Sequence, residues 1–239
     1  MHFFQVKCYT CNVVIDISQR FTLKVSLFRR AWITFSAYVI GCYASLLNDF
    51  RMKGAENIPS NGGVLLASNH ISAFETIFIP WAVIRHFPLQ VLWAPAKEEL
   101  FRNPLQRLLY SSWGAFPVRR GRDVRAGKTL NDLLRDHKVM LFPEGTRHPD
   151  GVLGKGNRGV GKIIYDTRPI VIPTALIGLN NWKFPAIRQE ATVVFGKPLD
   201  FADLRCREDC KETHQLIVDR VMSGIAELLK AEGAYRGES

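Results

Sequence analysis

From Gly54 onwards, short apolar runs alternate with longer amphipathic stretches, and this alternation constrains the fold more than any other feature. Short apolar runs between turn signals predict buried strands, whereas apolar positions at helical spacing predict helices packed on a sheet. The pattern predicts an α/β domain with a central mixed sheet flanked by helices. We expect strands at residues 64–68, 91–94, 115–118, 139–142, 170–177 and 191–195, and helices at residues 73–85, 104–111, 124–136, 159–165 and 211–231.

The N-terminal region has a different residue pattern, with a charge-free run of 17 residues at positions 31–47. A helix of this length measures about 26 Å, just short of the ~30 Å hydrocarbon core of a bilayer. It can cross the membrane, enter one leaflet or lie in the protein core. The neighbouring apolar residues 21–28, with Lys24 among them, favour a membrane-associated hairpin or an interfacial anchor. We expect an N-terminal membrane-associated helical segment over residues 1–52 and the α/β domain over residues 53–239, with Arg29 and Arg30 at the cytoplasmic face.

The charge balance of the chain favours an anionic partner. Lysine and arginine number 32 against 22 aspartates and glutamates, which gives a formal net charge of +10. This excess does not choose among a phospholipid surface, a phosphorylated substrate, an acidic carrier protein and a nucleic acid. A basic surface without any such partner is the remaining alternative.

The five cysteines argue against a disulfide framework, because their number is odd and no signal peptide precedes them. A reducing, cytoplasmic setting fits this usage better. Cys8 and Cys11 have half the spacing of a zinc site, but no second pair completes it. We therefore expect no structural metal.

His70 and Glu75 are the strongest candidates for acid and base chemistry. Neutral imidazole accepts a proton near pH 7, and a carboxylate on its other nitrogen fixes the tautomer. On one continuous helix the two side chains would point about 140° apart, so the pairing requires His70 to precede the helix. The exit of the strand at 64–68, with Ser72 as an N-cap, predicts this arrangement and places Glu75 in the first helical turn.

Ser72 and Glu75 also have the spacing of a capping box, in which the glutamate accepts a hydrogen bond from the backbone of the capping serine. The two roles of Glu75 are compatible, because a carboxylate has two oxygens with several acceptor sites.

Asn69-His70-x-x-x-x-Glu75, followed by Phe142-Pro143-Glu144-Gly145-Thr146-Arg147, resembles the glycerolipid acyltransferase family. Two weaker blocks, at residues 114–119 and 171–173, follow the order of that family. The resemblance covers about residues 54 to 200, which makes residues 53–239 an acyltransferase catalytic domain.

The resemblance implies a reaction and a set of site residues. His70 takes the proton from an acceptor hydroxyl, which attacks the thioester of acyl-CoA or acyl carrier protein, and Glu75 supports the imidazole. Arg119 binds the phosphate of the acceptor, for which a guanidinium is well matched. The implied acceptor is a lysolipid, 1-acyl-glycerol 3-phosphate above others, and no cofactor or metal is needed. The acceptor site is completed by Glu144, Gly145, Thr146 and Arg147.

One departure from the family pattern concerns Glu75, where most members have aspartate. Lipid A acyltransferases use a similar histidine and carboxylate pair, so another lysolipid acceptor remains an alternative. Those enzymes lack the block that begins at Phe142, which favours the glycerolipid branch. A basic protein that binds a membrane surface or nucleic acid is a second alternative, but it leaves His70, Glu75 and Glu144 without a role, so we expect no nucleic-acid partner.

Overall fold

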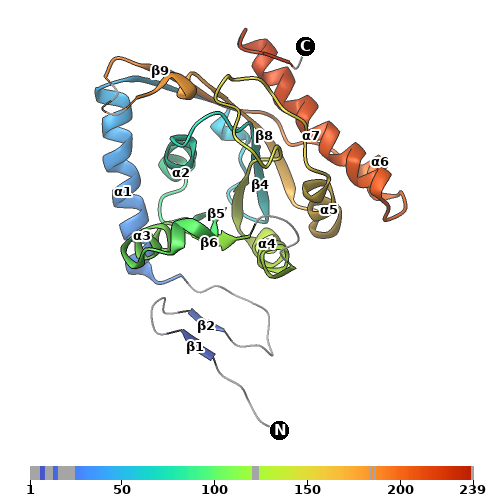
Figure 1. Ribbon diagram of the computed structural model, residues 1–239, viewed down its shortest axis with the longest axis horizontal. Coiled ribbons are helices and arrows are strands. Elements are labelled where there is room, and N and C mark those ends of the chain that lie inside the picture. Colours follow the sequence, from blue (N-terminus) through green and yellow to red (C-terminus); the bar gives the residue numbers. More distant parts are fainter. Residues whose placement is uncertain are drawn as a thin grey trace.

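A seven-stranded mixed sheet forms the centre of the computed structural model, which describes residues 6–8, 13–15, 25–119, 124–183, 185 and 187–237 (Figure 1). Its strand order is β3-β9-β8-β4-β7-β5-β6, and every neighbouring pair is parallel except β8 with β9. The predicted mixed α/β sheet is thus confirmed. The strands are β3 (Asp49–Lys53), β4 (Val64–Ser68), β5 (Leu92–Lys97), β6 (Ala115–Val118), β7 (Lys138–Leu141), β8 (Ile170–Ile177) and β9 (Glu190–Phe195).

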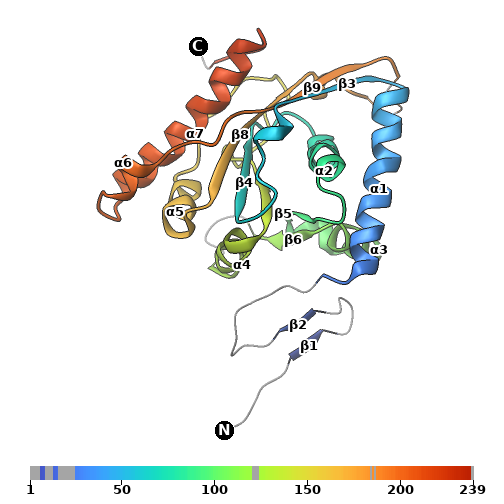
Figure 2. The ribbon, with the colours of Figure 1, turned by 180° about the vertical axis from the view of Figure 1, so that it is seen from behind.

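Helices cover both faces of this sheet, with α1 and α2 on one side and α5 and α7 on the other (Figures 1 and 2). The α-helices are α1 (Leu27–Leu46), α2 (Glu75–His86), α3 (Pro104–Ser112), α4 (Val124–Asp136), α5 (Arg158–Thr167), α6 (Ala202–Arg205) and α7 (Lys211–Ala231). Short 3₁₀ helices occupy Ala55–Asn57, Glu98–Phe101 and Leu179–Asn181.

The central strand β4 is buried at every position because both of its faces meet helices. Leu65 and Ala67 belong to the core cluster that includes α4, α5 and α7. Val64 and Leu66 belong to the cluster that includes α2. This continuous burial holds the carboxyl end of β4 rigidly, and His70 follows directly after it.

The sequence pattern missed β3, the short helix α6, and the paired strands β1 (Val6–Cys8) and β2 (Val13–Ile15), which lie in the segment that was predicted to be helical. Strand β3 pairs with β9 at the edge of the sheet, although its residues lie mainly in the predicted N-terminal segment. Its alternating exposure, with Phe50 and Met52 half-buried, is weaker than the apolar runs that mark the other strands.

The charge-free run at residues 31–47 does form a helix, but α1 is not the buried core helix that the sequence allowed. Its buried stripe is Ile33, Ala37, Gly41 and Ala44, whereas Phe28, Phe35 and Leu46 are 84%, 64% and 81% exposed. Within the described part of the chain, no helix combines the length and apolarity needed to cross a membrane. Residues 21–24 of the predicted hairpin lie outside the described residues, and β1 (Val6–Cys8) pairs antiparallel with β2 (Val13–Ile15) in the same N-terminal region.

Gly41 permits the close contact between α1 and α2. A Cβ atom at this position would lie 2.2 Å from the indole ring of Trp81. That indole is buried and packs edge-on against Tyr38, so it has little room to move away.

We predict that Gly41→Ala lowers the free energy of unfolding by about 1–3 kcal/mol, because the added methyl overpacks the helix contact. Urea unfolding measures this change. The matched control is Gly127→Ala in α4, where a Cβ would meet nothing within 4 Å. The control should be neutral or stabilising, since alanine is the better helix former. Equal stability of both variants would contradict the close packing.

Candidate active site

The predicted site residues gather at one edge of the sheet, where four parallel strands end. Of these residues, His70 follows β4, Glu144 follows β7 and Arg119 follows β6. Glu98, which the sequence did not single out, follows β5. In open α/β sheets, ligands bind in the crevice outside the carboxyl ends of the strands. The topology therefore brings together three blocks that lie far apart in the sequence, at residues 69–75, 114–119 and 142–147.

His70 and Glu75 are in direct contact, as the sequence predicts. The Nδ1 atom of His70 meets Oε1 of Glu75, a fully buried carboxylate in the first turn of α2. Because the carboxylate can only accept a hydrogen bond, Nδ1 keeps its hydrogen and donates, and the lone pair of the neutral imidazole remains on Nε2. The His70 side chain is 16% exposed, so the base is sheltered and yet open to a ligand.

The second oxygen of Glu75 performs the capping role. Oε2 accepts hydrogen bonds from the backbone N–H of Ser72 at 2.7 Å and of Ile71 at 3.3 Å. The dyad and the capping interaction thus coexist in one side chain. Ser72 itself is not the N-cap that we predicted, because α2 begins at Glu75 and Phe74 precedes it. The Ser72 hydroxyl instead accepts a hydrogen bond from the Phe74 N–H at 3.2 Å, which closes a turn before the helix.

The main chain of His70 is held on both sides by the loop between β7 and α5. Its N–H donates to Oε2 of Glu144 at 2.7 Å, and its carbonyl accepts from the N–H of His148 at 2.7 Å. The His70 ring also stacks on Phe142, with 4.1 Å between the ring centroids. These three contacts fix both the peptide and the plane of the imidazole.

Glu144 is a buried carboxylate that joins two loops. Its Oε1 accepts a hydrogen bond from the N–H of Gly154 at 2.9 Å, while its Oε2 holds His70. Burial raises the pKa of this carboxyl, against the opposing effect of the hydrogen bonds from Gly154 and His70. Both oxygens are therefore engaged with the backbone, and its predicted contact with the acceptor stays a prediction.

The remaining residues of this block lie at the surface of the same loop. Gly145 has a positive φ of 70°, and its N–H closes a turn on the carbonyl of Phe142 at 3.0 Å. Thr146 and Arg147 are exposed, and the Thr146 hydroxyl lies 3.4 Å from Nε2 of His148. The turn thus directs Thr146 and Arg147 outwards beside His70.

Arg119 forms an ion pair with Glu98 at this edge. Its Nε and Nη2 atoms donate to the two carboxylate oxygens at 2.7 and 3.0 Å. Three strand spacings, or about 14 Å, separate β6 from β4. Glu98 follows β5, which lies between β6 and β7 in the sheet. The ion pair therefore orients the Arg119 guanidinium towards β7 and β4, and His70 follows β4.

His148 is the site residue that sequence reasoning missed. Its sequence context carries no signal of this role, because only the folded loop brings its N–H to the His70 carbonyl. Gly154 likewise carries no signal of its role. Within the described residues, no group of three or more histidine, cysteine or acidic side chains is arranged to hold a metal ion. Cys11, the second cysteine of the incomplete Cys8 and Cys11 pair, lies outside the described residues.

The chain is similar to known proteins in both sequence and fold. Residues 49–177 match the family model described as Acyltransferase. The chain is similar to 1-acyl-sn-glycerol-3-phosphate acyltransferases of Bacillus subtilis, with 28% identity over 73% of this chain and 87% of the relative, and of Borreliella burgdorferi, with 28% identity over 54% and 51%. In fold it is similar to the crystal structure of PlsC, the 1-acyl-sn-glycerophosphate acyltransferase from Thermotoga maritima. The TM-score is 0.63 at 22% identity, over 83% of this chain and 79% of that one.

We predict a pH signature for the buried Glu144 carboxyl. A group whose pKa is raised in the folded state stabilises the fold below its ordinary pKa and loses that contribution as the pH rises through the folded-state value. The unfolding free energy of the wild type, measured relative to Glu144→Gln, should therefore fall as the pH rises from about 4 to 8.

Urea unfolding across this pH range measures the difference between the two proteins. Glu208→Gln is the matched control, because Glu208 is exposed. A difference that stays constant with pH, or that the control reproduces, would contradict the burial of an ionisable carboxyl at this point.

Proposed function

Because the chain belongs to the acyltransferase family, we propose that it transfers a fatty acyl group from an acyl thioester to the free hydroxyl of a lysophospholipid, with 1-acyl-glycerol 3-phosphate as acceptor and phosphatidate as product. The observation that carries this proposal is the contact between His70 and the buried Glu75 at the carboxyl edge of the sheet. The names of the relatives support the choice of acceptor.

The dyad provides the proton transfer that the reaction needs. Nε2 of His70 takes the proton of the acceptor hydroxyl while its oxygen attacks the thioester carbonyl carbon. The new C–O bond forms, the C–S bond breaks, and the protonated imidazole gives its proton to the departing thiolate. Glu75 keeps Nδ1 protonated and stabilises the imidazolium that forms in between.

Arg119 is the proposed partner of the acceptor phosphate. Its ion pair with Glu98 is exposed, with 75% of the Arg119 side chain and 45% of the Glu98 side chain accessible to solvent. Exposed pairs contribute little to stability, so a phosphate dianion can replace Glu98 at low cost. A guanidinium fork binds phosphate in the same bidentate way as it binds a carboxylate. Gly145, Thr146 and Arg147 are proposed to contact the acceptor from the facing loop.

Membrane association completes the proposal. The outer face of α1 exposes large apolar side chains, among them Phe28 and Phe35, as an interfacial anchor does. Arg29 and Arg30 at its start favour the cytoplasmic face. An acceptor with one acyl chain can then remain in the leaflet while its headgroup reaches His70. Acyl-CoA and acyl carrier protein are both suitable donors.

We predict that His70→Ala lowers turnover by at least about 10²- to 10⁴-fold, because it removes the general base. Purified protein is assayed with a panel of lysolipids and glycerol 3-phosphate against both donors, and unfolding curves check that the variant folds. The matched control is His86→Ala, an exposed histidine at the end of α2. Turnover at the wild-type rate in His70→Ala would refute the mechanism, and a wild type inactive on every acceptor would refute the function.

Glu75→Gln should slow turnover by roughly 10²- to 10⁴-fold, since the amide no longer fixes the tautomer of the imidazole. The rate is expressed per folded molecule. Ser72→Ala is the comparison, because it removes the hydroxyl that receives the Phe74 N–H but leaves the dyad intact. That variant should lose about 1 kcal/mol of stability and keep its rate. If Glu75→Gln behaves like Ser72→Ala, capping is its main role.

A further inference from the structure

Helix α3 is amphipathic but turns its apolar side away from the protein. None of its residues is buried, and Leu105 and Leu108 are 75% and 61% exposed. A helix of a soluble protein normally buries such a face against the core. We propose that α3 docks on the surface of an anionic phospholipid leaflet, as a second membrane contact outside the N-terminal segment.

The apolar face of α3 continues directly into that of α1. Leu105, Leu108 and Ser112 are spaced i, i+3 and i+7, so they share one face of α3. The Ser112 hydroxyl accepts a hydrogen bond from Nε1 of Trp32 at 3.1 Å, and the Ser112 carbonyl accepts one from Nε of Arg29 at 3.0 Å.

On α1, Phe28 and Phe35 lie one turn before and after Trp32 and therefore share its stripe. The ring centroids of Trp32 and Phe35 are 6.5 Å apart. Figure 1 shows α1 and α3 side by side. Their exposed apolar residues thus form one surface, the α1–α3 platform, which consists of Phe28, Trp32, Phe35, Leu105 and Leu108.

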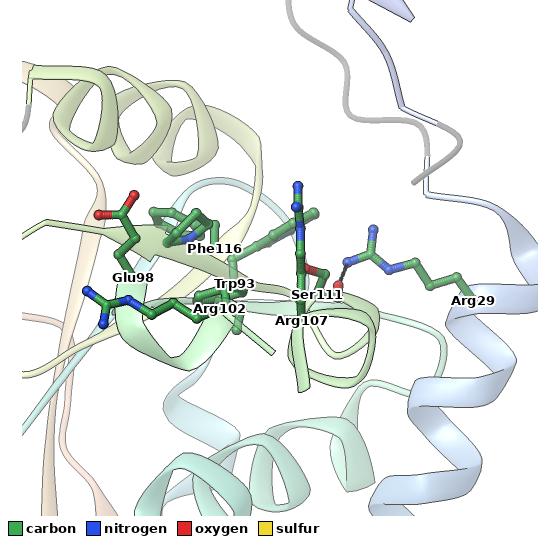
Figure 3. A pocket seen from close by; sticks show the side chains of 10 residues that line it. Arg29, Trp93, Glu98, Arg102, Arg107, Ser111 and Phe116 are labelled. Atoms are coloured by element: carbon green, nitrogen blue, oxygen red, sulfur yellow. Dashed lines mark hydrogen bonds between the residues drawn. The ribbon is translucent and has the colours of Figure 1, made fainter. Parts of the chain in front are cut away.

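Positive charge lies next to the platform. A cavity of about 590 Å³ is lined by Arg29, Arg102 and Arg107, with Trp93 and Phe116 between them (Figure 3). Glu98, the ion-pair partner of Arg119, is the acidic residue in this lining. Arg102 and Arg107 are exposed, and no described residue forms a hydrogen bond or ion pair with either guanidinium. Cations beside protruding apolar side chains are the combination that binds an anionic membrane interface.

Two other occupants fit these features less well. A second copy of the chain, docked symmetrically, would bring the arginines of both copies together, in a protein of net charge +10. An acidic carrier protein would match the arginines but would leave the protruding phenylalanines and leucines of the platform without a partner.

Docking through α3 also orients the site. The 3₁₀ helix Glu98–Phe101 leads into α3, and its first residue, Glu98, forms the ion pair with Arg119. The platform therefore holds the Arg119 end of the sheet edge close to the leaflet, where a lysolipid headgroup lies. This consequence rests on the proposed function, whereas the docking itself does not.

The experiment measures co-sedimentation of the full chain with phosphatidylcholine vesicles, either pure or mixed with phosphatidylglycerol. The double variant Leu105→Glu with Leu108→Glu should lower partitioning onto the mixed vesicles by at least about tenfold. The matched control is Leu216→Glu, a 42% exposed leucine on α7, which should bind like the wild type. Arg102→Gln and Arg107→Gln should each weaken binding to the mixed vesicles by roughly fivefold and leave pure phosphatidylcholine unaffected.

Three results would overturn the proposal. The double variant binds mixed vesicles as the wild type does, the Leu216→Glu control loses binding equally, or the double variant changes the oligomeric mass in solution, which would make the platform a contact between copies. Circular dichroism and unfolding curves confirm that each variant folds. Vesicle binding that depends on the platform, in a wild type inactive on every acceptor, would support the docking and refute the proposed function.

Discussion

The site depends on the hydrogen bond between the buried carboxylate of Glu144 and the backbone N–H of His70. His70 lies beyond the last hydrogen-bonded residue of β4, where neither strand nor helix satisfies its peptide groups. Glu144 and the N–H of His148 supply both missing partners from one loop. A catalytic imidazole must keep its position closely, and this loop gives its main chain a fixed place in the absence of regular secondary structure.

The length of the Glu75 side chain lets it bind the His70 imidazole and the backbone before α2 at the same time. One oxygen reaches Nδ1 of His70 and the other receives the N–H groups that precede α2. Aspartate is one methylene shorter, so from the same helical position it would reach less far towards either group. The glutamate therefore suits a helix that begins at the carboxylate itself, and its negative charge lies at the favourable end of the helix dipole.

The same edge of the sheet links the chemistry to the surface. His70 follows a strand buried on both faces, whereas Arg119 follows β6, the last strand, next to the exposed helix α3. The sheet thus runs from a buried interior to a basic and apolar rim. An acceptor that carries both a phosphate and an acyl chain needs both environments. Its hydroxyl reacts at the buried site beside His70, whereas its acyl chain stays in the leaflet at the apolar rim.

The sequence by itself determined the α/β class, the positions of most strands and helices, and the pairing of His70 with Glu75, because apolar periodicity and helix-start signals are local. It did not reveal β3, whose edge position leaves it only half-buried, or the exposed apolar face of α3, which looks from its pattern like any helix packed on a sheet. The sequence also did not reveal the hydrogen bonds that Glu144 and His148 form with the His70 backbone. Those contacts join residues more than 70 positions apart through main-chain atoms, which every residue possesses, so only the tertiary structure decides which ones meet.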